Sequence, residues 1–260
     1  MKLIDIKYKG IDIGKVLSIP LYGSVLANLY KAIFHCNSFH CSKVVSDICV
    51  IYTHKRSGRE DYFQIIENLV AYLKELSPEL VVMQPKFSII DKVRLVKHLF
   101  LGLSCFNKLQ GSFLYRLYLF ILIARIRVDV DYVMTFLKKS KVSVVVTFCD
   151  AHYMDNIITQ CANSLSIKTV TLQHGQYSID EKDTPENMAL SNLVSNYFCA
   201  WGEATCDEFM KIANDVTKVM PLGSLRTEVN GSKPYTACAI AESKSKRLIC
   251  LMFLIWFSLN

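Results

Sequence analysis

Four short apolar runs in the second half of the chain carry the clearest structural signal. Each is rich in β-branched and aromatic residues, as buried strands are, and neighbouring runs are far enough apart to leave room for a helix. The runs are Val142–Phe148, Lys168–Leu172, Asn196–Ala200 and Thr217–Met220.

Apolar residues at helical spacing fill two of the gaps between these runs. After the first run, the residues that would share one helix face are Met154, Ile157, Ile158, Cys161 and Leu165. After the third run, they are Cys206, Phe209, Met210 and Ala213. Nearly continuous apolar strands joined by single helices predict a parallel sheet with helices on both faces and right-handed crossovers. The expected fold class is therefore α/β, a Rossmann-like layer.

The first third of the chain has weaker patterns. A short strand is expected near Leu3–Tyr8, then a turn at Gly10 and Gly14, then a largely helical stretch to about Phe34.

A clearer helix-to-strand step follows. Ser57-Gly-Arg-Glu60 fits a capping box. Apolar residues then recur at helical spacing from Tyr62 to Leu76, and Leu80–Met83 predicts a strand.

Residues 86–141 stand apart in charge. They include eleven basic and three acidic residues, whereas the whole chain carries a formal net charge of +7, so the remainder is close to neutral. We expect residues 86–140 to form two or three helices with a break near Gly111, as an excursion from the sheet. Because the cations alternate with Leu, Ile and Phe, an anionic membrane surface is a better partner than nucleic acid. Alternatively, these are core helices whose cations extend to solvent.

Composition narrows the class of protein. Of 260 residues 52% are hydrophobic, and Gly plus Pro number only 16, which excludes general disorder and collagen-like repeats. The ten cysteines are irregularly spaced, which favours reduced thiols over a disulfide framework. The start lacks the apolar core of a secretory signal. The longest apolar stretches, Phe113–Ile126 and Leu248–Leu259, fall short of the roughly 20 residues that cross a bilayer.

Polar residues follow each of the four runs. In a parallel sheet, ligands bind beyond the carboxyl ends of the strands, so these residues would meet at one edge. The segments are Cys149-Asp150-Ala-His152-Tyr-Met-Asp155-Asn156, Gln173-His174-Gly175-Gln176-Tyr177, Trp201-Gly202-Glu203 and Pro221-Leu-Gly223-Ser224-Leu-Arg226.

His174 is the candidate with the most direct chemistry. An imidazole at a strand end, followed by Gly175, can take a proton from a substrate hydroxyl near neutral pH, or it can simply hydrogen-bond within a turn. Asp150 precedes a helix and is either its N-cap or a ligand contact, with the N-cap favoured. His152, Asp155 and Asn156 either contact polar ligand groups or face solvent.

The two later strand ends also allow two interpretations. Trp201, with Gly202, can stack on a sugar or base, although packing is the commoner role of such a tryptophan. Gly223 and Ser224, with Arg226, can hold an anion or form an ordinary turn.

Metal and cofactor motifs are weak. His35, Cys36, His40 and Cys41 are too tightly spaced to suit one tetrahedral zinc site. Asp129-Val-Asp131 looks like a metal-binding pair, but a charge pair at a helix start is the favoured interpretation. GxGxxG, GxxxxGK[ST], HExxH and GxSxG are all missing from the sequence, which argues against dehydrogenase, P-loop, zinc-protease and serine-hydrolase functions. No metal site and no tightly bound cofactor are expected.

Taken together, TFCDAHYMDN, TVTLQHGQY, YFCAWGEAT and MPLGSLR resemble the amino-terminal half of bacterial surface-polysaccharide transferases of the two-domain GT-B architecture. Capsule-polysaccharide proteins and CDP-glycerol glycerophosphotransferases are the nearest in pattern. The resemblance covers residues 140–226 well and residues 1–140 only in general layout.

The resemblance implies transfer of a sugar or polyol phosphate from a nucleotide-activated sugar or CDP-glycerol to a hydroxyl of a polysaccharide or lipid-linked acceptor. His174 would be the base. The substrate contacts would be Asp150, His152, Asp155, Asn156, Gln173, Gly175, Gln176, Tyr177, Trp201, Gly202, Gly223, Ser224 and Arg226. The protein would be cytoplasmic, with the basic helices resting on the inner face of the cell membrane.

The chain departs from that family after Arg226, where 34 residues take the place of a second Rossmann domain. We therefore expect one acceptor-side domain over residues 1–226 and an irregular tail over 227–260, in a chain truncated or frameshifted near its end. Two other functions stay open: a non-catalytic, membrane-associated acceptor-binding domain, and a nucleotide-sugar epimerase.

Overall fold

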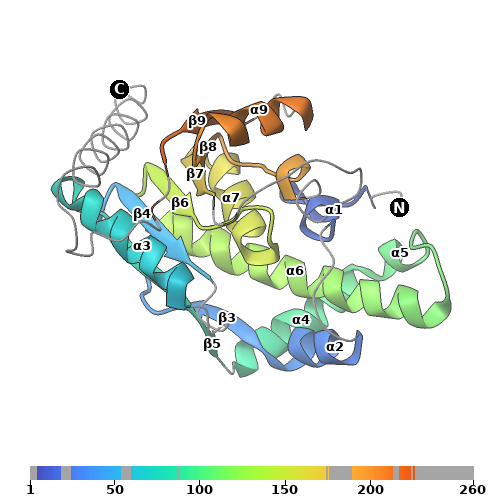
Figure 1. Cartoon of the computed structure of the whole chain (residues 1–260). Coiled ribbons are helices and arrows are strands. Elements are labelled where there is room, and N and C mark those ends of the chain that lie inside the picture. Colours follow the sequence, from blue (N-terminus) through green and yellow to red (C-terminus); the bar gives the residue numbers. More distant parts are fainter. Residues whose placement is uncertain are drawn as a thin grey trace.

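The computed structural model describes residues 5–18, 25–53, 60–86, 88–173, 175, 189–212, 217–223 and 225 (Figure 1). The capping-box residues Ser57 to Arg59 and the tail 227–260 lie outside these ranges. Within them, helices pack on both faces of one large sheet, and a two-stranded hairpin lies near the N-terminus.

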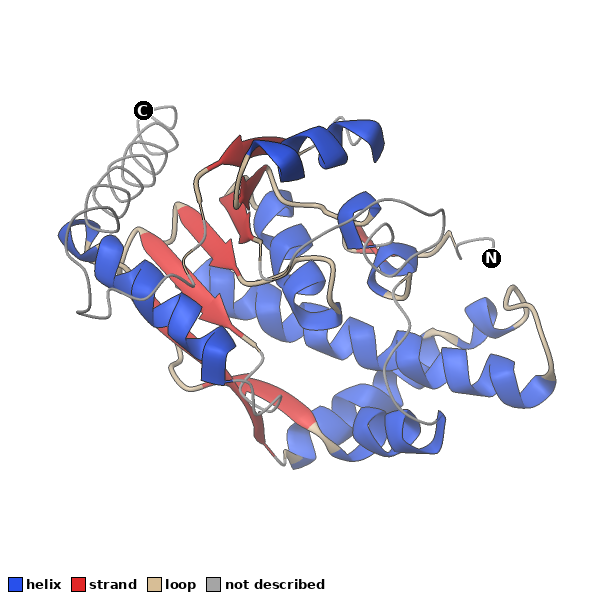
Figure 2. Ribbon diagram, viewed as in Figure 1, coloured by secondary structure: helices blue, strands red, loops and turns tan. Residues whose placement is uncertain are grey.

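The large sheet has the strand order β3-β5-β4-β6-β7-β8-β9 (Figure 2). All neighbouring pairs from β5 to β9 are parallel, and the edge strand β3 is antiparallel to β5. The strands are β3 Cys36–Phe39, β4 Ile48–Tyr52, β5 Glu79–Lys86, β6 Val144–Thr147, β7 Lys168–Leu172, β8 Tyr197–Ala200 and β9 Lys218–Pro221. The predicted Rossmann-like α/β fold is thus confirmed, with each of the four predicted runs forming a strand.

Two of these strands were not predicted. All five residues of β4, Ile48–Tyr52, are buried, as are all four of β6, because both strands are covered on both faces. The run Ile-Cys-Val-Ile-Tyr has the same composition as the runs that were recognised, but it lacks a helical pattern directly before it. The other missed strand, β3, forms where only a helix and four possible metal ligands were noted.

Helices cover the sheet on two sides, each with its own core cluster. One cluster joins α1 (Ile13–Val16), α6 (Phe113–Lys139) and α7 (Tyr153–Ser164) to alternate strand residues such as Val145. The other joins α3 (Glu60–Tyr72) and α9 (Glu203–Ile212) to the intervening residues such as Val144 and Val146. In Figure 1, α3 and α6 lie on opposite sides of the sheet.

The predicted excursion is a group of three helices: α4 (Ile89–Leu101), α5 (Leu103–Phe106) and α6. The Ser88 and Ser112 side chains cap α4 and α6 by accepting backbone N–H groups. The expected break falls at Gly111, whose φ of 109° favours glycine. In the part of the chain that the structure describes, no helix has both the length and the apolar character needed to cross a bilayer.

Asp129 and Asp131 lie inside α6, so the expected charge pair at a helix start is wrong. Asp129 is buried and accepts from Arg125 Nε at 3.1 Å and from the Tyr153 hydroxyl of α7 at 3.0 Å. Burial acts to lower the pKa of the Arg125 guanidinium, but the adjacent Asp129 carboxylate outweighs it, and the pKa stays above its ordinary value. The two charges therefore stabilise each other inside the core.

The N-terminal segment packs against the same helix. β1 (Lys7–Tyr8) and β2 (Ile11–Asp12) form a hairpin whose turn includes Gly10, and α2 (Val25–Phe34) follows α1. The Tyr8 hydroxyl donates to Asp131 at 3.0 Å, and His98 Nε2 lies 3.0 Å from the other Asp131 oxygen. Asp131 therefore links the hairpin, α4 and α6.

Replacing Arg125 with alanine leaves Asp129 as a buried charge that has lost its cation. We expect the free energy of unfolding to fall by about 3–5 kcal/mol, measured by urea denaturation. The matched control is Arg94→Ala, which breaks the exposed helical pair with Asp91 and should cost about 1 kcal/mol or less. Equal losses for the two variants would contradict a core role for Arg125.

Candidate functional site

The carboxyl ends of β6, β7, β8 and β9 meet at one edge of the sheet. In the register of the sheet, Thr147 pairs with Thr171, Leu172 with Cys199, and Cys199 with Met220. The ends of all four strands therefore lie level with one another. The segments singled out from the sequence therefore start from a common edge.

Asp150 is fully buried and holds a distant segment of the chain. Its Oδ2 accepts the backbone N–H groups of Val194 at 2.9 Å and Ser195 at 2.6 Å. Its own N–H donates to Thr171 Oγ1 at 3.1 Å. The N-cap of α7 is His152, so the expectation that Asp150 caps this helix is wrong. The carboxylate instead fixes the segment that leads into β8.

Asp155 and Asn156 are also fully buried. Asp155 accepts the N–H of Cys149 at 3.0 Å and the hydroxyl of Thr53 at 2.6 Å. Asn156 Nδ2 donates to the carbonyl of Asp150 at 2.8 Å. These side chains shape the turn between β6 and α7, and of the polar residues predicted there only His152 is partly exposed.

Burial changes the acidity of Asp150. Removal from water raises the pKa of this carboxyl to about 6, although the N–H groups of Val194 and Ser195 act in the opposite direction. Burial likewise raises the pKa of the Cys161 and Cys199 thiols to about 12. The eight cysteines in the described ranges are free, and high pKa values make such thiols poor nucleophiles.

Gln173 and Trp201 are joined by two hydrogen bonds at the ends of β7 and β8. The Gln173 side-chain oxygen accepts the backbone N–H of Trp201, and the Trp201 indole N–H donates to the Gln173 carbonyl at 2.9 Å. Gln173 Nε2 donates to the carbonyl of Gly175 at 2.7 Å. Gln173 is buried and Trp201 is partly exposed, so the indole is held in a fixed position at the rim.

Three glycines lie along the same rim. A Cβ added at Gly175 or Gly202 would meet nothing within 4 Å, so there is open space beside both. Gly223 has φ of 90° and donates its N–H to Ala200, which continues the pairing beyond β9. The remaining predicted site residues lie outside the described ranges: His174, Gln176, Tyr177, Ser224 and Arg226.

The topology points to a further position that sequence reasoning missed. With β3 set aside, the parallel strands have the chain order 2-1-3-4-5-6, so the crossovers leave β4 and β6 in opposite directions. Ligands of doubly wound sheets bind at such a switch point. Thr53, directly after β4, is hydrogen-bonded to Asp155 at this point. If Ile48–Tyr52 had been recognised as a strand, the position of Thr53 at the switch point could have been predicted.

The possible metal ligands noted in the sequence do not gather. Cys36 is buried in β3, and His40 Nδ1 accepts the backbone N–H of Val82 at 3.0 Å. Among the described residues, no group of three or more His, Cys, Asp or Glu could hold a metal ion.

Comparison with known proteins finds no match to this chain among family models, curated proteins or solved structures. The class that is established is a Rossmann-like α/β protein with a mostly parallel sheet.

The pKa of Asp150 predicts a pH effect on stability. Because the pKa is higher in the folded protein than the ordinary 3.8, the fold binds this proton more tightly than the unfolded chain does. The contribution of Asp150 to stability is therefore greatest below pH 4 and falls by about 3 kcal/mol as the pH rises past 6. Asp150→Asn should remove this fall in urea denaturation series between pH 4 and 7.

The control for that series is Asp207→Asn, which replaces an exposed aspartate of α9. Its stability should follow the wild-type pH profile. A profile of Asp150→Asn parallel to wild type would show that Asp150 is not the group responsible.

Proposed function

We propose that this chain is the acceptor-side domain of a glycosyltransferase of bacterial surface-polysaccharide assembly. A complete transferase of this kind, which also has a donor-side domain, transfers a sugar or polyol phosphate from a nucleotide-activated donor to an acceptor hydroxyl. The observation that carries the proposal is the parallel order of β6 to β9, since it brings the ends of the strands that resemble such transferases to one edge.

In this proposal His174 is the general base. It accepts the proton of the acceptor hydroxyl while the hydroxyl oxygen bonds to the donor's sugar carbon or phosphorus, and the nucleotide leaves with the electrons of the broken bond. Trp201, fixed by Gln173, offers a flat wall for a sugar ring. The open space beside Gly175 and Gly202 lets a ligand approach the main chain.

The exposed face of α4 supports a membrane location. Ile89, Val93, Val96 and Phe100 recur at helical spacing and are 71%, 65%, 50% and 70% exposed. The opposite face of α4, which includes Leu95, packs against α6. An apolar stripe turned to solvent along a surface helix is typical of an interfacial membrane helix.

Cations lie on this helix and on the segments that follow it. Lys92, Arg94 and Lys97 are on α4, and Lys108 and Arg116 follow on the neighbouring segments, whereas Asp91 is the only acidic residue between positions 86 and 128. Each Lys or Arg near an anionic bilayer contributes about 1 kcal/mol, so the stripe and its cations together favour reversible binding to the inner face of the cell membrane.

One observation favours a second function, a non-catalytic domain that binds the acceptor at the membrane. Asp150, Asp155 and Asn156 are all buried and hydrogen-bonded to main-chain groups or to Thr53, which leaves fewer polar groups for substrate chemistry. Titration calorimetry with nucleotide sugars and CDP-glycerol separates the two, because a domain without a donor site binds none of them.

In a full-length transferase that contains this domain, His174→Ala should reduce transfer by at least about 100-fold, the usual contribution of a general base. The assay is mass spectrometry of lipid-linked acceptor incubated with a panel of nucleotide-activated sugars and CDP-glycerol. The control is Lys218→Ala, an exposed change on β9 that should leave turnover intact. Full turnover by a folded His174→Ala protein would rule out the assigned role.

Phe100→Ser should weaken binding to vesicles of phosphatidylcholine and phosphatidylglycerol by about tenfold, because the bound protein would no longer bury this aromatic side chain in the bilayer interface. Met210→Ser is the matched control, since Met210 is also 70% exposed but lies on α9. Co-sedimentation measures both. Unchanged vesicle binding by Phe100→Ser would reject the stripe as the membrane contact. Loss of a dimer instead, seen by sedimentation velocity, would assign the stripe to a second copy of the chain.

A further inference from the structure

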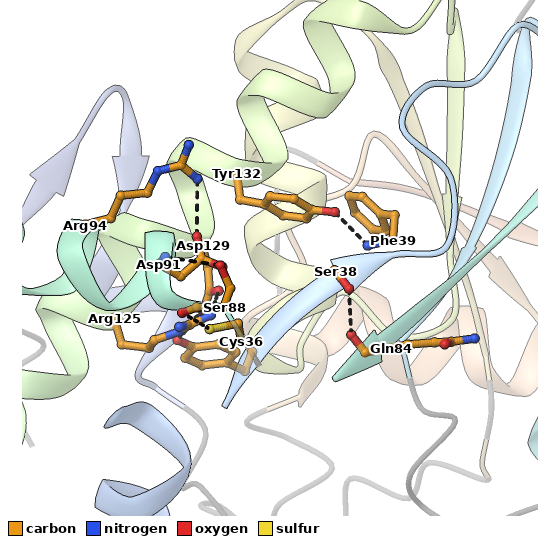
Figure 3. Close-up of polar contacts among 11 residues, drawn as sticks. Cys36, Ser38, Phe39, Gln84, Ser88, Asp91, Arg94, Arg125, Asp129 and Tyr132 are labelled. Atoms are coloured by element: carbon orange, nitrogen blue, oxygen red, sulfur yellow. Dashed lines mark hydrogen bonds and ion pairs between the residues drawn. The ribbon is translucent and has the colours of Figure 1, made fainter. Parts of the chain in front are cut away.

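A cavity of about 510 Å³ with a mixed polar and apolar lining lies at the edge of the sheet opposite β9. Its walls are the edge strand β3 with the residues that follow it, the start of α4 and the C-terminal half of α6. Figure 3 shows this region: the hydroxyl of Tyr132 from α6 lies next to Phe39 of β3, and Arg94 and Asp91 from α4 lie on the other side of Tyr132. Its size is within the range of small-molecule sites.

Cations reach this cavity from three separate elements. Lys86 ends β5, Arg94 belongs to α4 and Lys139 ends α6, and all three side chains are exposed. Asp91 is the one acidic residue among the described lining residues, and Arg94 Nη1 lies 3.2 Å from its carboxylate. The cavity therefore has an excess of positive charge that no single helix or strand would produce.

Neutral hydrogen-bonding groups surround these cations. The His40 ring also lines the cavity, and its Nδ1 lies 3.0 Å from the backbone N of Val82. Further polar groups come from β3, from the turn after it and from both helices. These lining residues are Asn37, Ser38, Ser42, Ser88 and Thr135.

Aromatic packing makes one wall rigid. The Phe39 ring stacks on Tyr132 and packs against Phe136, with centroid distances of 5.4 and 4.1 Å. The Phe39 N–H donates to the Tyr132 hydroxyl oxygen at 2.7 Å, which satisfies an outward-facing group of the edge strand. The cavity is thus preformed, with a polar, cationic part beside an aromatic part.

We propose that this cavity binds the phosphate group of a small molecule or lipid. The phosphate would lie among Lys86, Arg94 and Lys139, and the rest of the ligand against the Tyr132 side of the aromatic wall. This is a second site, at the other end of the sheet from the Gln173–Trp201 rim, and it does not rest on the proposed transferase function. Arg94 is on α4, the helix that also carries the exposed stripe, so a lipid headgroup and a soluble phosphate compound are the two sources of the same chemistry.

The test uses the whole chain and two probes. Inorganic pyrophosphate is titrated by calorimetry, and phosphatidylcholine vesicles with and without phosphatidic acid are tested by co-sedimentation. Lys86→Ala and Lys139→Ala should each weaken binding of the effective probe by about tenfold, the value of a lost charged hydrogen bond. Lys218→Ala, which removes an exposed lysine from β9, should have no effect.

A change in the opposite direction gives an independent check. Asp91→Asn removes the acidic residue from the lining and should tighten binding of the same probe. All four replaced side chains lie at least partly exposed, and circular dichroism with urea denaturation verifies that each variant keeps the fold.

The probe whose binding is weakened by the lysine substitutions identifies the source of the phosphate group. Loss confined to pyrophosphate indicates a soluble phosphate ligand, whereas loss confined to phosphatidic acid vesicles indicates a headgroup. The proposal is overturned if neither probe binds, or if Lys86→Ala and Lys139→Ala bind both probes as wild type does. Neither assay involves transfer, so failure here is distinct from failure of the transferase proposal.

Discussion

The buried pair of Arg125 and Asp129 is the interaction that fixes the arrangement of this protein. Charges this far from water are tolerated only when they are paired and hydrogen-bonded, and here the same carboxylate also accepts from Tyr153 of α7. The pair therefore sets the rotation of α6 about its own axis. That rotation decides which residues of α6 face the sheet and which support α4.

A related use of buried polar groups governs the edge of the sheet. Asp150 and Asp155 both follow β6, and each ties the turn to another part of the chain, Asp150 to the segment before β8 and Asp155 to the end of β4. Side chains engaged in this way fix the geometry of the edge. Any chemistry at this edge consequently depends on residues that follow β7 and β8, where Trp201 is held by Gln173.

Local periodicity was enough to predict β6 to β9, α7, α9 and the helical excursion, because each of these elements is a continuous run with one pattern. It was not enough for β4, a five-residue apolar run without an adjoining signal, or for the interior position of Asp129 in α6. The roles of the polar residues were harder still. Asp150 is bonded to residues 44 and 45 positions away, a contact that depends on tertiary packing and leaves no local pattern.

The continuity of α6 has a mechanical consequence. This helix of 27 residues is about 40 Å long, with Phe113 and Leu114 exposed at its first turn and the amino edge of the sheet at its last. Because its middle is fixed in the core, the body of the protein must tilt with it as one unit. A tilt of about 10° imposed at the first turn displaces the far end by about 7 Å, so a small rotation at the exposed end becomes a large displacement at the sheet.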